Sequence, residues 1–401
     1  MKPWNGICAL VLVAGLLGGC VRPSPSSDCA GGPVAEVVPG AAPAGPSSPG
    51  AAGQSSPGAA VGQSSPGSVP VGQNAGGGLW VADGGGAVQA VDGRTGRVVK
   101  TVTVAGIEPR MPPALVAAGG SLWVYRFDTG ALARIDPVTG AVRARATVKP
   151  VTRLVENGIT FAHGSLWIAQ PGKLWRVSPA GQVSSTALPI GFGPSAAAAT
   201  GRWLWLASGK QLLRIDPARP ENTTEIELTE SVGQLTYIDD VNATGGRLYA
   251  VGINSPVVRR LDPDSGAVVG QTRLKHDELA LSLAGNWAIG NCGSVVRLPD
   301  GPAVRVSDIS QDLPSVLVGG DLWVGDEVRS EIVRIDAATG QVRARLPFAA
   351  TDPDDPAFNL MAGAGTGSVW VLDGGVSRVD ADRVTRILPA EPGESRAAAA
   401  F

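Results

Sequence analysis

Short apolar runs centred on one aromatic residue recur from residue 78 towards the end of the chain. The runs are GLWVAD, SLWVYR, SLWIAQ, WLWLAS, RLYAVG, GNWAIG, DLWVGD and SVWVLD, centred on Trp80, Trp123, Trp167, Trp205, Tyr249, Trp287, Trp323 and Trp370. Each run is too short for a helix and rich in Leu, Val and aromatic residues, which favours a buried β-strand. The recurrence of such runs predicts a repeat architecture.

Three further strand patterns accompany each aromatic run. A second run follows it, as in LARIDP, LLRIDP and EIVRIDA, and a third follows the next turn, as in AVRARATV and QVRARLPF. Most units also begin with a short apolar run such as ALVAAGG or SVLVGG. The aromatic residues are 36 to 47 residues apart, close to the length of a four-stranded propeller blade. The chain is therefore predicted to be an all-β propeller of eight antiparallel blades, with seven blades as the alternative if a weak unit is irregular.

The turns between the second and third runs of a unit share an acidic first residue and a glycine at the end. They read DGRTG, DPVTG, DPDSG and DAATG, beginning at Asp92, Asp136, Asp262 and Asp336. A carboxylate at this place accepts hydrogen bonds from turn amides, while glycine adopts a positive φ. Because the motif recurs at one junction, a structural role is preferred over calcium binding. The mid-strand tryptophans are likewise predicted to form the core between blades rather than a platform for a ligand.

The two ends of the repeat region predict how the ring closes. The first unit begins at Leu79 without a convincing strand before it, whereas the chain ends in SRAAAAF, beyond the eighth unit. That tail resembles PSAAAAT, residues 194–200, which occupies the first-strand position of the fourth unit. We therefore expect the C-terminal strand to complete the first blade and to remove an exposed sheet edge.

Residues 1–19 have the features of an N-terminal signal peptide. Lys2 precedes an apolar stretch, residues 7–17, that is too short to cross a bilayer, and small residues follow it. The run LLGGC resembles the lipobox of bacterial lipoproteins, which implies cleavage before Cys20 and attachment of lipid to its sulfur. An ordinary secretory signal is the alternative. Lipidation would anchor the protein in the bacterial cell envelope, on the extracytoplasmic side of a membrane.

Residues 20–77 form a tract rich in Pro, Ser, Gly and Ala. The tract repeats segments such as SSPGAAGQ and SSPGAAVGQ and has too few large apolar residues to build a core. It is predicted to be a disordered tether, with a root-mean-square reach of roughly 40 Å. The tether would join the lipidated Cys20 to the propeller, residues 78–401.

The repeats from Gly78 to about Leu388 resemble the YVTN-type and streptogramin-lyase-like β-propellers, with pyrroloquinoline-quinone-type repeats a step further away. The resemblance implies the fold, but propellers host enzymes, sensors and scaffolds alike. A streptogramin-lyase-like enzyme would be expected to use paired histidines and a glutamate with a divalent cation. The chain has two histidines, His163 and His276, and neither has a partner at a ligand spacing. This departure argues against that activity.

The charge of the chain argues against a nucleic-acid partner, and two of its cysteines have no role in export or lipidation. A formal net charge of -2 without a Lys/Arg cluster argues against a nucleic-acid partner. Of the four cysteines, Cys8 leaves with the signal peptide and Cys20 takes the lipid. Cys29 and Cys292 remain as a candidate disulfide outside the cytoplasm, although the sequence does not show that they meet. The sequence contains no nucleophile elbow or phosphate-binding loop, so no catalytic residue and no organic cofactor is assigned.

The third residue past each aromatic residue defines a candidate site. In the predicted register these residues share one face of the disc with the connections between blades. They are Asp83, Arg126, Gln170, Ser208, Gly252, Gly290, Asp326 and Asp373. Ring closure makes the seventh, eighth and first units neighbours, which predicts an acidic arc of Asp83, Asp326, Glu327 and Asp373 with Asp352, Asp354 and Asp355 of the connection TDPDDP. The arc is a candidate site for a cationic group or a divalent ion; the alternative is a set of solvated loop carboxylates.

Two functions from different classes follow from these features. The first is a lipid-anchored extracytoplasmic propeller that binds an envelope protein or a small extracellular ligand through one face of its disc. The second is a metal-assisted lyase or lactone-type hydrolase that uses carboxylates in the central funnel. The scarcity of histidine and the lack of a nucleophile motif favour the binding or scaffold module.

Overall fold

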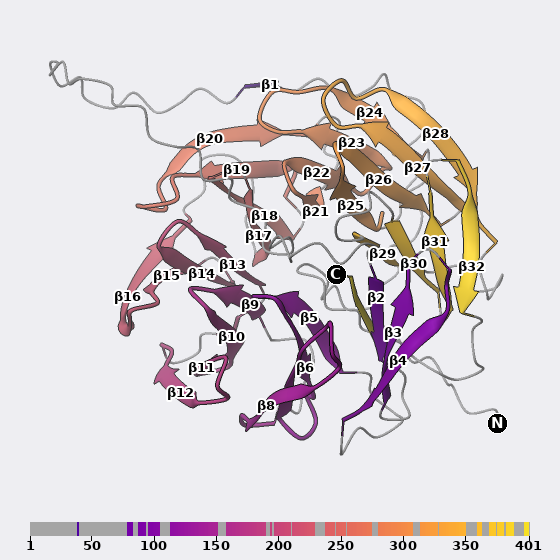
Figure 1. The fold of residues 1–401 in the computed structure, drawn as a ribbon. Helices are drawn as coiled ribbons and strands as arrows, with labels where there is room; N and C mark the ends of the chain where they lie inside the picture. The colour runs from indigo at the N-terminus through magenta and orange to yellow at the C-terminus, as the bar shows by residue number, and fades with distance from the viewer. Residues whose placement is uncertain are drawn as a thin grey trace, which may run out of the picture.

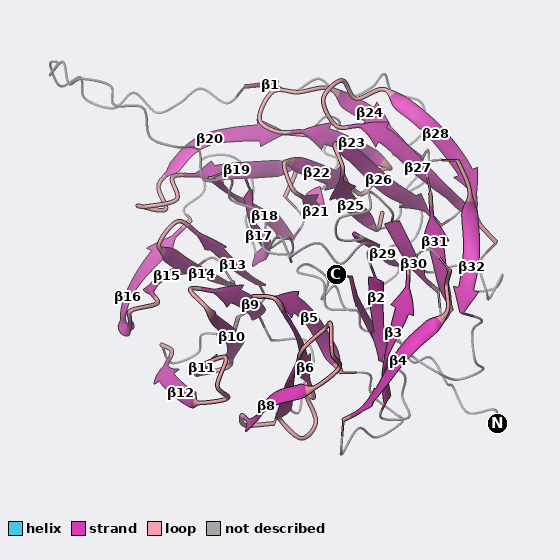
Figure 2. Ribbon diagram, in the orientation of Figure 1, coloured by secondary structure: helices cyan, strands magenta, loops and turns pink. Residues whose placement is uncertain are grey.

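The computed structural model shows a closed ring of eight antiparallel sheets around a central axis (Figure 1). It describes residues 38–39, 78–82, 87–93, 95–104, 113–150, 158–189, 193–194, 196–209, 211–228, 237–244, 246–253, 255–274, 280–307, 313–327, 329–349, 359–362, 369–373, 375–380, 382–388 and 397–400. Every regular element in these residues is a β-strand (Figure 2). The predicted eight-bladed all-β propeller is confirmed, and the seven-bladed alternative is wrong. Within the same residues, no helix is long and apolar enough to cross a membrane.

The first four blades each contain four strands, ordered from the central axis outward. Blade one consists of β33 (Ala397–Ala400), β2 (Gly78–Ala82), β3 (Ala87–Asp92) and β4 (Val98–Thr103). Blade two consists of β5 (Ala114–Ala118), β6 (Ser121–Tyr125), β7 (Ala131–Ile135) and β8 (Val142–Thr147). Blade three consists of β9 (Gly158–Ala162), β10 (Ser165–Gln170), β11 (Lys173–Val177) and β12 (Val183–Ala187). Blade four consists of β13 (Ala196–Thr200), β14 (Trp203–Ser208), β15 (Gln211–Asp216) and β16 (Arg219–Glu227).

The remaining four blades continue the ring in chain order. Blade five consists of β17 (Tyr237–Thr244), β18 (Arg247–Ile253), β19 (Val257–Leu261) and β20 (Val268–Arg273). Blade six consists of β21 (Ala280–Ala284), β22 (Trp287–Gly290), β23 (Ser294–Arg297) and β24 (Ala303–Arg305). Blade seven consists of β25 (Ser315–Val318), β26 (Asp321–Asp326), β27 (Glu331–Asp336) and β28 (Val342–Pro347). Blade eight consists of β29 (Asn359–Ala362), β30 (Val369–Leu372), β31 (Val376–Val379) and β32 (Val384–Leu388).

The C-terminal strand closes the ring. β33 pairs antiparallel with β2, placing Ala400 opposite Leu79 and Ala397 opposite Ala82. β33 also contacts β29 of blade eight and β5 of blade two, so it stands between its neighbours like the first strand of any other blade. The predicted closure is confirmed, and it leaves the inner wall of the ring without an unpaired edge at β2.

The second strand of each blade forms the core between blades. β6 and β10 are buried along their whole length, whereas β8, an outermost strand, alternates between exposed and half-buried residues. The aromatic residues of the eight runs are at most 3% exposed. Trp123 of blade two, for example, shares a cluster with Leu166 and Ile168 of blade three. The interpretation of the tryptophans as inter-blade core is confirmed.

The acidic turns are held by their own carboxylates. Asp136 Oδ1 accepts the backbone N–H groups of Val138 and Thr139, both at 2.9 Å, and Oδ2 accepts Arg143 Nη2 at 2.7 Å. The Thr139 amide and the Arg143 guanidinium hold the pKa of Asp136 well below its usual range. The structural role predicted for these aspartates is therefore confirmed at this turn.

The glycine that ends the Asp262 turn of blade five packs against blade four, the preceding blade. Gly266 has a φ of 76°, and a Cβ added there would lie 2.8 Å from Cη2 of Trp205 in blade four. Both the left-handed conformation and the close approach require a residue without a side chain. The turn of blade five thus packs against the core tryptophan of blade four.

A short strand in the N-terminal tract was not expected from the sequence. β1 (Val38–Pro39) pairs antiparallel with β20, placing Val38 opposite Arg273 and Pro39 opposite Thr272. Blade five is therefore a five-stranded sheet, with β1 on its outer edge (Figure 1). The sequence predicts a coil here because the tract cannot form a core. Addition to an existing sheet edge instead uses backbone groups, which leave no apolar pattern in the sequence.

Candidate functional site

The disc has two faces that carry different polar groups. The face where the second strand of each blade ends also carries the connections between blades and is termed the connection face. The opposite face carries the turns that follow the third strand, such as that beginning at Asp336, and is termed the turn face. The predicted acidic arc belongs to the connection face.

Three of the seven residues of the acidic arc lie in the described residues. They are Asp326 and Glu327, at the end of β26, and Asp373, directly after β30. Asp83, Asp352, Asp354 and Asp355 lie outside the described residues. β29 contacts both β25 and β33, so blades seven, eight and one are consecutive in the ring as predicted. The arc as a whole stays a prediction.

Asp326 is held by the loop that follows it. Its side chain is 0% exposed, and Oδ1 accepts the backbone N–H of Arg329 at 3.0 Å. Oδ2 lies 3.7 Å from Nη1 of the Arg329 guanidinium, and this same Nη1 donates to the carbonyl of Val306 in blade six at 3.2 Å. The ion pair therefore fixes the loop of blade seven against blade six.

Asp373 is held by an arginine of the outermost strand of its own blade. Nη1 and Nη2 of Arg386, in β32, lie 2.5 Å from Oδ1 and 2.8 Å from Oδ2 of the carboxylate. This bidentate geometry is among the strongest charge-assisted arrangements in proteins. Arg386 Nη2 also donates to the carbonyl of Ala349, which follows blade seven, at 3.2 Å. A cation bound at Asp373 would have to displace the guanidinium.

Two of the three described carboxylates of the arc have an arginine partner. Asp326 and Asp373 each carry a charge that an arginine already balances. Across the described ranges, no group of three or more His, Cys, Asp or Glu side chains could hold a metal ion. The cation hypothesis therefore depends on the four arc residues that the structure does not describe.

Blades two and three carry Arg126 and Gln170 at the position that Asp326 and Asp373 occupy in blades seven and eight. Both side chains are buried and have structural partners. Arg126 is 2% exposed and pairs with Asp128, with Nε 3.0 Å from Oδ1. Gln170 Nε2 donates to the Tyr125 hydroxyl at 3.1 Å and to the Lys149 carbonyl at 3.0 Å. Burial raises the pKa of Tyr125 to about 12, so its hydroxyl is neutral at physiological pH. This cluster joins the connection faces of two blades.

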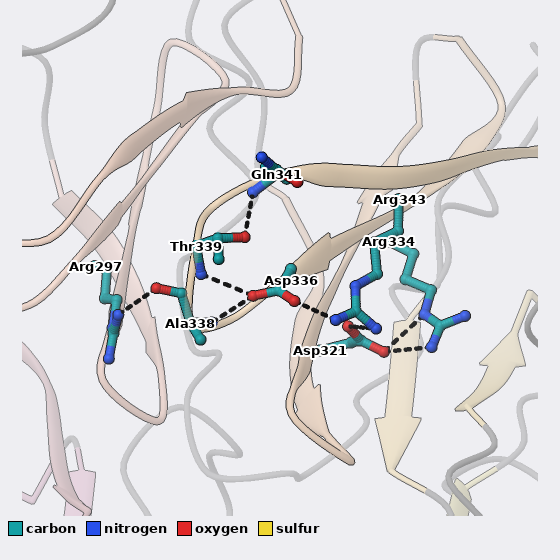
Figure 3. Close-up of polar contacts among 8 residues, drawn as sticks. All are labelled: Arg297, Asp321, Arg334, Asp336, Ala338, Thr339, Gln341 and Arg343. Carbon is teal, nitrogen blue, oxygen red and sulfur yellow. Dashed lines mark hydrogen bonds and ion pairs between the residues drawn. The ribbon is translucent and has the colours of Figure 1, made fainter.

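The turn face carries a charged cluster that sequence analysis did not identify. Figure 3 shows Asp321, at the start of β26, between Arg334 of β27 and Arg343 of β28. Asp321 Oδ2 accepts Arg334 Nε at 2.7 Å, and its Oδ1 lies 3.3 Å from Arg343 Nη1. Arg343 also pairs with Asp336, which in turn accepts the N–H groups of Ala338 and Thr339 (Figure 3).

The arginine of this cluster belongs to a recurring pair with the core tryptophan. The guanidinium carbons of Arg134, Arg176 and Arg334 lie 5.9, 5.4 and 5.3 Å from the ring centroids of Trp123, Trp167 and Trp323. Each Nε donates to the residue two positions before the tryptophan: Ser121 at 2.8 Å, Ser165 at 3.0 Å and Asp321 at 2.7 Å. The signal in the sequence of these three blades is the Ser or Asp directly before the LW pair, together with the Arg of the next strand.

Arginines also connect consecutive blades across the turn face. Arg134 Nη1 of blade two donates to the Pro179 carbonyl of blade three at 3.0 Å. Arg297 Nη1 of blade six donates to the Ala338 carbonyl of blade seven at 2.6 Å (Figure 3). Arg378 of blade eight donates to a turn carbonyl of blade one, which adds a side-chain contact to the ring closure.

The remaining predicted residues are the histidines and the cysteines. Cys292 lies in the loop after β22, on the connection face of blade six, and is disulfide-bonded. Its predicted partner, Cys29, and the predicted lipid site, Cys20, lie outside the described residues, as does His276. His163 is exposed in the turn between β9 and β10.

Comparisons with known proteins support the fold. No protein-family model matches the chain, and no curated protein matches it. Among solved structures, apo AztD from Citrobacter koseri is 14% identical, with a TM-score of 0.53 over 81% of this chain and 98% of that one. Sqt1 from Saccharomyces cerevisiae is 12% identical, with a TM-score of 0.54 over 80% and 92%.

A streptogramin B lyase structure is similar to this chain to a lesser degree. It is 12% identical, with a TM-score of 0.45 over 79% of this chain and 89% of that one. A match at this level carries no argument about activity. Similarities of such low identity to solved structures establish the shared fold alone, because one fold hosts many unrelated functions.

Proposed function

We propose that this protein is a lipid-anchored, extracytoplasmic β-propeller that serves as a binding or scaffold module in the bacterial cell envelope. The observation that carries the proposal is the disulfide at Cys292. Structural disulfides persist in oxidising compartments and are rare in the cytosol. The disulfide agrees with the signal peptide and with the LLGGC run, which both indicate export.

The connection face is the binding surface in this proposal. Where the structure describes this face, ion pairs join Asp326 with Arg329, Asp373 with Arg386 and Asp128 with Arg126. A surface whose side chains are already ordered loses less conformational freedom on binding. The disc thus offers a rigid platform for an envelope protein or a small extracellular ligand.

Two positions in blade two make a matched test of this surface. Thr129 is exposed in the loop between β6 and β7, on the connection face, and Val138 is 50% exposed in the turn on the opposite face. A photo-crosslinking amino acid at either position is introduced into the full chain in its native membrane. We expect a specific protein or ligand adduct from position 129 and a several-fold weaker adduct from position 138. Equal adducts, or none from position 129, would overturn the assignment of the surface.

The anchor is tested separately by the mass of the peptide that begins at Cys20. We expect the diacylglyceryl mass on Cys20 and retention of the chain in the membrane fraction, with Cys20→Ser soluble. A soluble wild-type chain with unmodified Cys20 would overturn the anchor. Metal analysis of the same preparation tests the competing enzyme function: a stoichiometric divalent ion that is lost in the variant with Asp83, Asp326 and Asp373 replaced by Asn would favour it.

A further inference from the structure

Two observations bear on where the N-terminal tract meets the propeller. The first is the pairing of β1 with β20, the outermost strand of blade five. The second is the disulfide at Cys292, in the neighbouring blade six. The two places are in contact, because Thr272 Oγ1 of β20 donates to the Pro299 carbonyl of blade six at 2.8 Å. The tract therefore meets the propeller far from the point where the propeller begins.

The chain offers few partners for Cys292. The sequence contains three other cysteines, Cys8, Cys20 and Cys29. In the proposed lipoprotein, Cys8 is removed with the signal peptide and the sulfur of Cys20 forms a thioether, so Cys29 alone keeps a thiol. Eight residues separate Cys29 from Val38, which is the first residue of β1. A bridge from Cys29 and the pairing of β1 would thus hold the two ends of one short segment.

We propose that Cys29 is the disulfide partner of Cys292, so that the segment from Cys29 to Pro39, termed the strap, is attached to blade six at one end and to blade five at the other. This attachment holds blades five and six towards the membrane. The proposal rests on the lipid anchor at Cys20. The strap leaves eight residues between Cys20 and Cys29, so the anchor lies within about 30 Å of the disc even when this segment is fully extended. A free tether would instead join the anchor to Gly78 through 57 residues.

The two arrangements join the anchor to opposite sides of the ring. Gly78 opens β2 in blade one, and blade five lies across the ring from blade one (Figure 1). The 38 residues between Pro39 and Gly78 return the chain to blade one, and a coil of that length has a reach of roughly 35 Å. Held by the strap, blades five and six are the part of the disc nearest to the bilayer.

The bridge is tested by peptide mapping of the full chain without reduction. We expect one linked species that contains Cys29 and Cys292 and that separates on reduction. A free Cys292, or a Cys292 linked to another cysteine, would overturn the strap. The mapping does not depend on the anchor: an unlipidated Cys20 together with the linked peptide would overturn the proposed anchor and support the docking of the strap.

The orientation is tested with the lipidated chain in vesicles of phosphatidylethanolamine and phosphatidylglycerol. A photo-crosslinking amino acid replaces either Val269 of β20, which is 43% exposed, or Val99 of β4, which is 60% exposed. We expect lipid adducts at position 269 to exceed those at position 99 by several-fold. Equal labelling, or stronger labelling at position 99, would overturn the orientation.

A double variant shows whether the bridge causes the orientation. Cys29→Ser with Cys292→Ser removes both thiols, and its fold is checked by circular dichroism against the wild type. We expect the labelling ratio of position 269 to position 99 to fall at least twofold in this background. An unchanged ratio would overturn the role of the bridge.

Discussion

Blade seven keeps every element of the repeat, whereas blade five has lost several of them. In blade seven, Arg334 lies over Trp323 and donates to Asp321 at the start of the same strand. In blade five, the aromatic residue is Tyr249, and an exposed arginine, Arg247, replaces the Ser or Asp that would receive the hydrogen bond. Blade five thus lacks the Arg–Asp pair that links the second and third strands of blade seven.

The arginine of blade five that corresponds to Arg334 contacts the outermost strand of its blade. Arg260, opposite Tyr249 in the register, donates to the Val269 carbonyl of β20 at 3.4 Å. The edge of β20 is also where β1 adds to the sheet. The comparison shows that blade five, whose outer edge pairs with β1, lacks the tryptophan and the acceptor that blade seven combines with its arginine.

The largest effect is expected from removing the core aromatic of blade seven. Trp323 packs with Ile332, Leu346 and Val369, across the boundary to blade eight. Trp323→Ala should lower the free energy of unfolding by about 3 to 5 kcal/mol, because it leaves a large cavity. Guanidinium unfolding followed by circular dichroism measures the change. The control is Val342→Ala, on the exposed outer strand of the same blade, which should stay within about 0.5 kcal/mol of the wild type.

A smaller effect is expected from removing Asp321, the hydrogen-bond acceptor that blade seven has and blade five lacks. Asp321→Ala leaves Arg334 and Arg343 without their shared carboxylate and should cost about 2 kcal/mol, less than for a fully buried pair because both arginines are partly exposed. Asp321→Ser recreates the hydroxyl acceptor of blades two and three and should recover part of that loss. Equal losses in the two variants would show that the acceptor does not secure the blade.

The blades and their closure could be predicted from the sequence because their signals are local. The aromatic run, the Asp turn and the spacing of the units each depend on a few adjacent residues. The tail around Ala397 could be assigned because it repeats the composition of the first strand of blade four. β1 could not be predicted, because two residues that pair through their backbone leave no side-chain pattern.

The candidate site could be predicted only in part. The sequence located Asp326 and Asp373 at the ends of second strands and on one face of neighbouring blades. It did not provide their partners, because Arg329 lies in a loop and Arg386 lies two strands away across the sheet. Such pairs depend on the register of strands that are distant in sequence. The sequence of one repeat therefore does not show which arginine pairs with a given carboxylate, because only the folded blade brings the two side chains together.

Acid should destabilise the turns that begin at Asp262 in blade five and at Asp336 in blade seven. Hydrogen bonds from Ser265 lower the pKa of Asp262, and the Thr339 amide with Arg343 lowers that of Asp336. A folded pKa below the unfolded value of about 3.9 stabilises the fold above that pH, and this stability is lost as the pH falls through the folded value. The melting temperature of the wild type should fall between about pH 4 and pH 2. In Asp262→Asn and in Asp336→Asn it should fall less over the same range. A wild-type slope in either variant would contradict the turn's contribution.

The smallest effect is expected at the aromatic residue that blade five substitutes for tryptophan. The Tyr249 hydroxyl is buried and has no hydrogen-bond partner among the described residues. Tyr249→Phe should therefore leave the free energy of unfolding unchanged or raise it by up to about 1 kcal/mol, since a buried unpaired polar group is removed. Tyr125→Phe is the matched control, because the Tyr125 hydroxyl accepts from Gln170; it should lose about 1 kcal/mol. A loss of the same size at Tyr249 would mean that its hydroxyl is bound by a segment the structure does not describe, and blade five would then be held as firmly as blade seven.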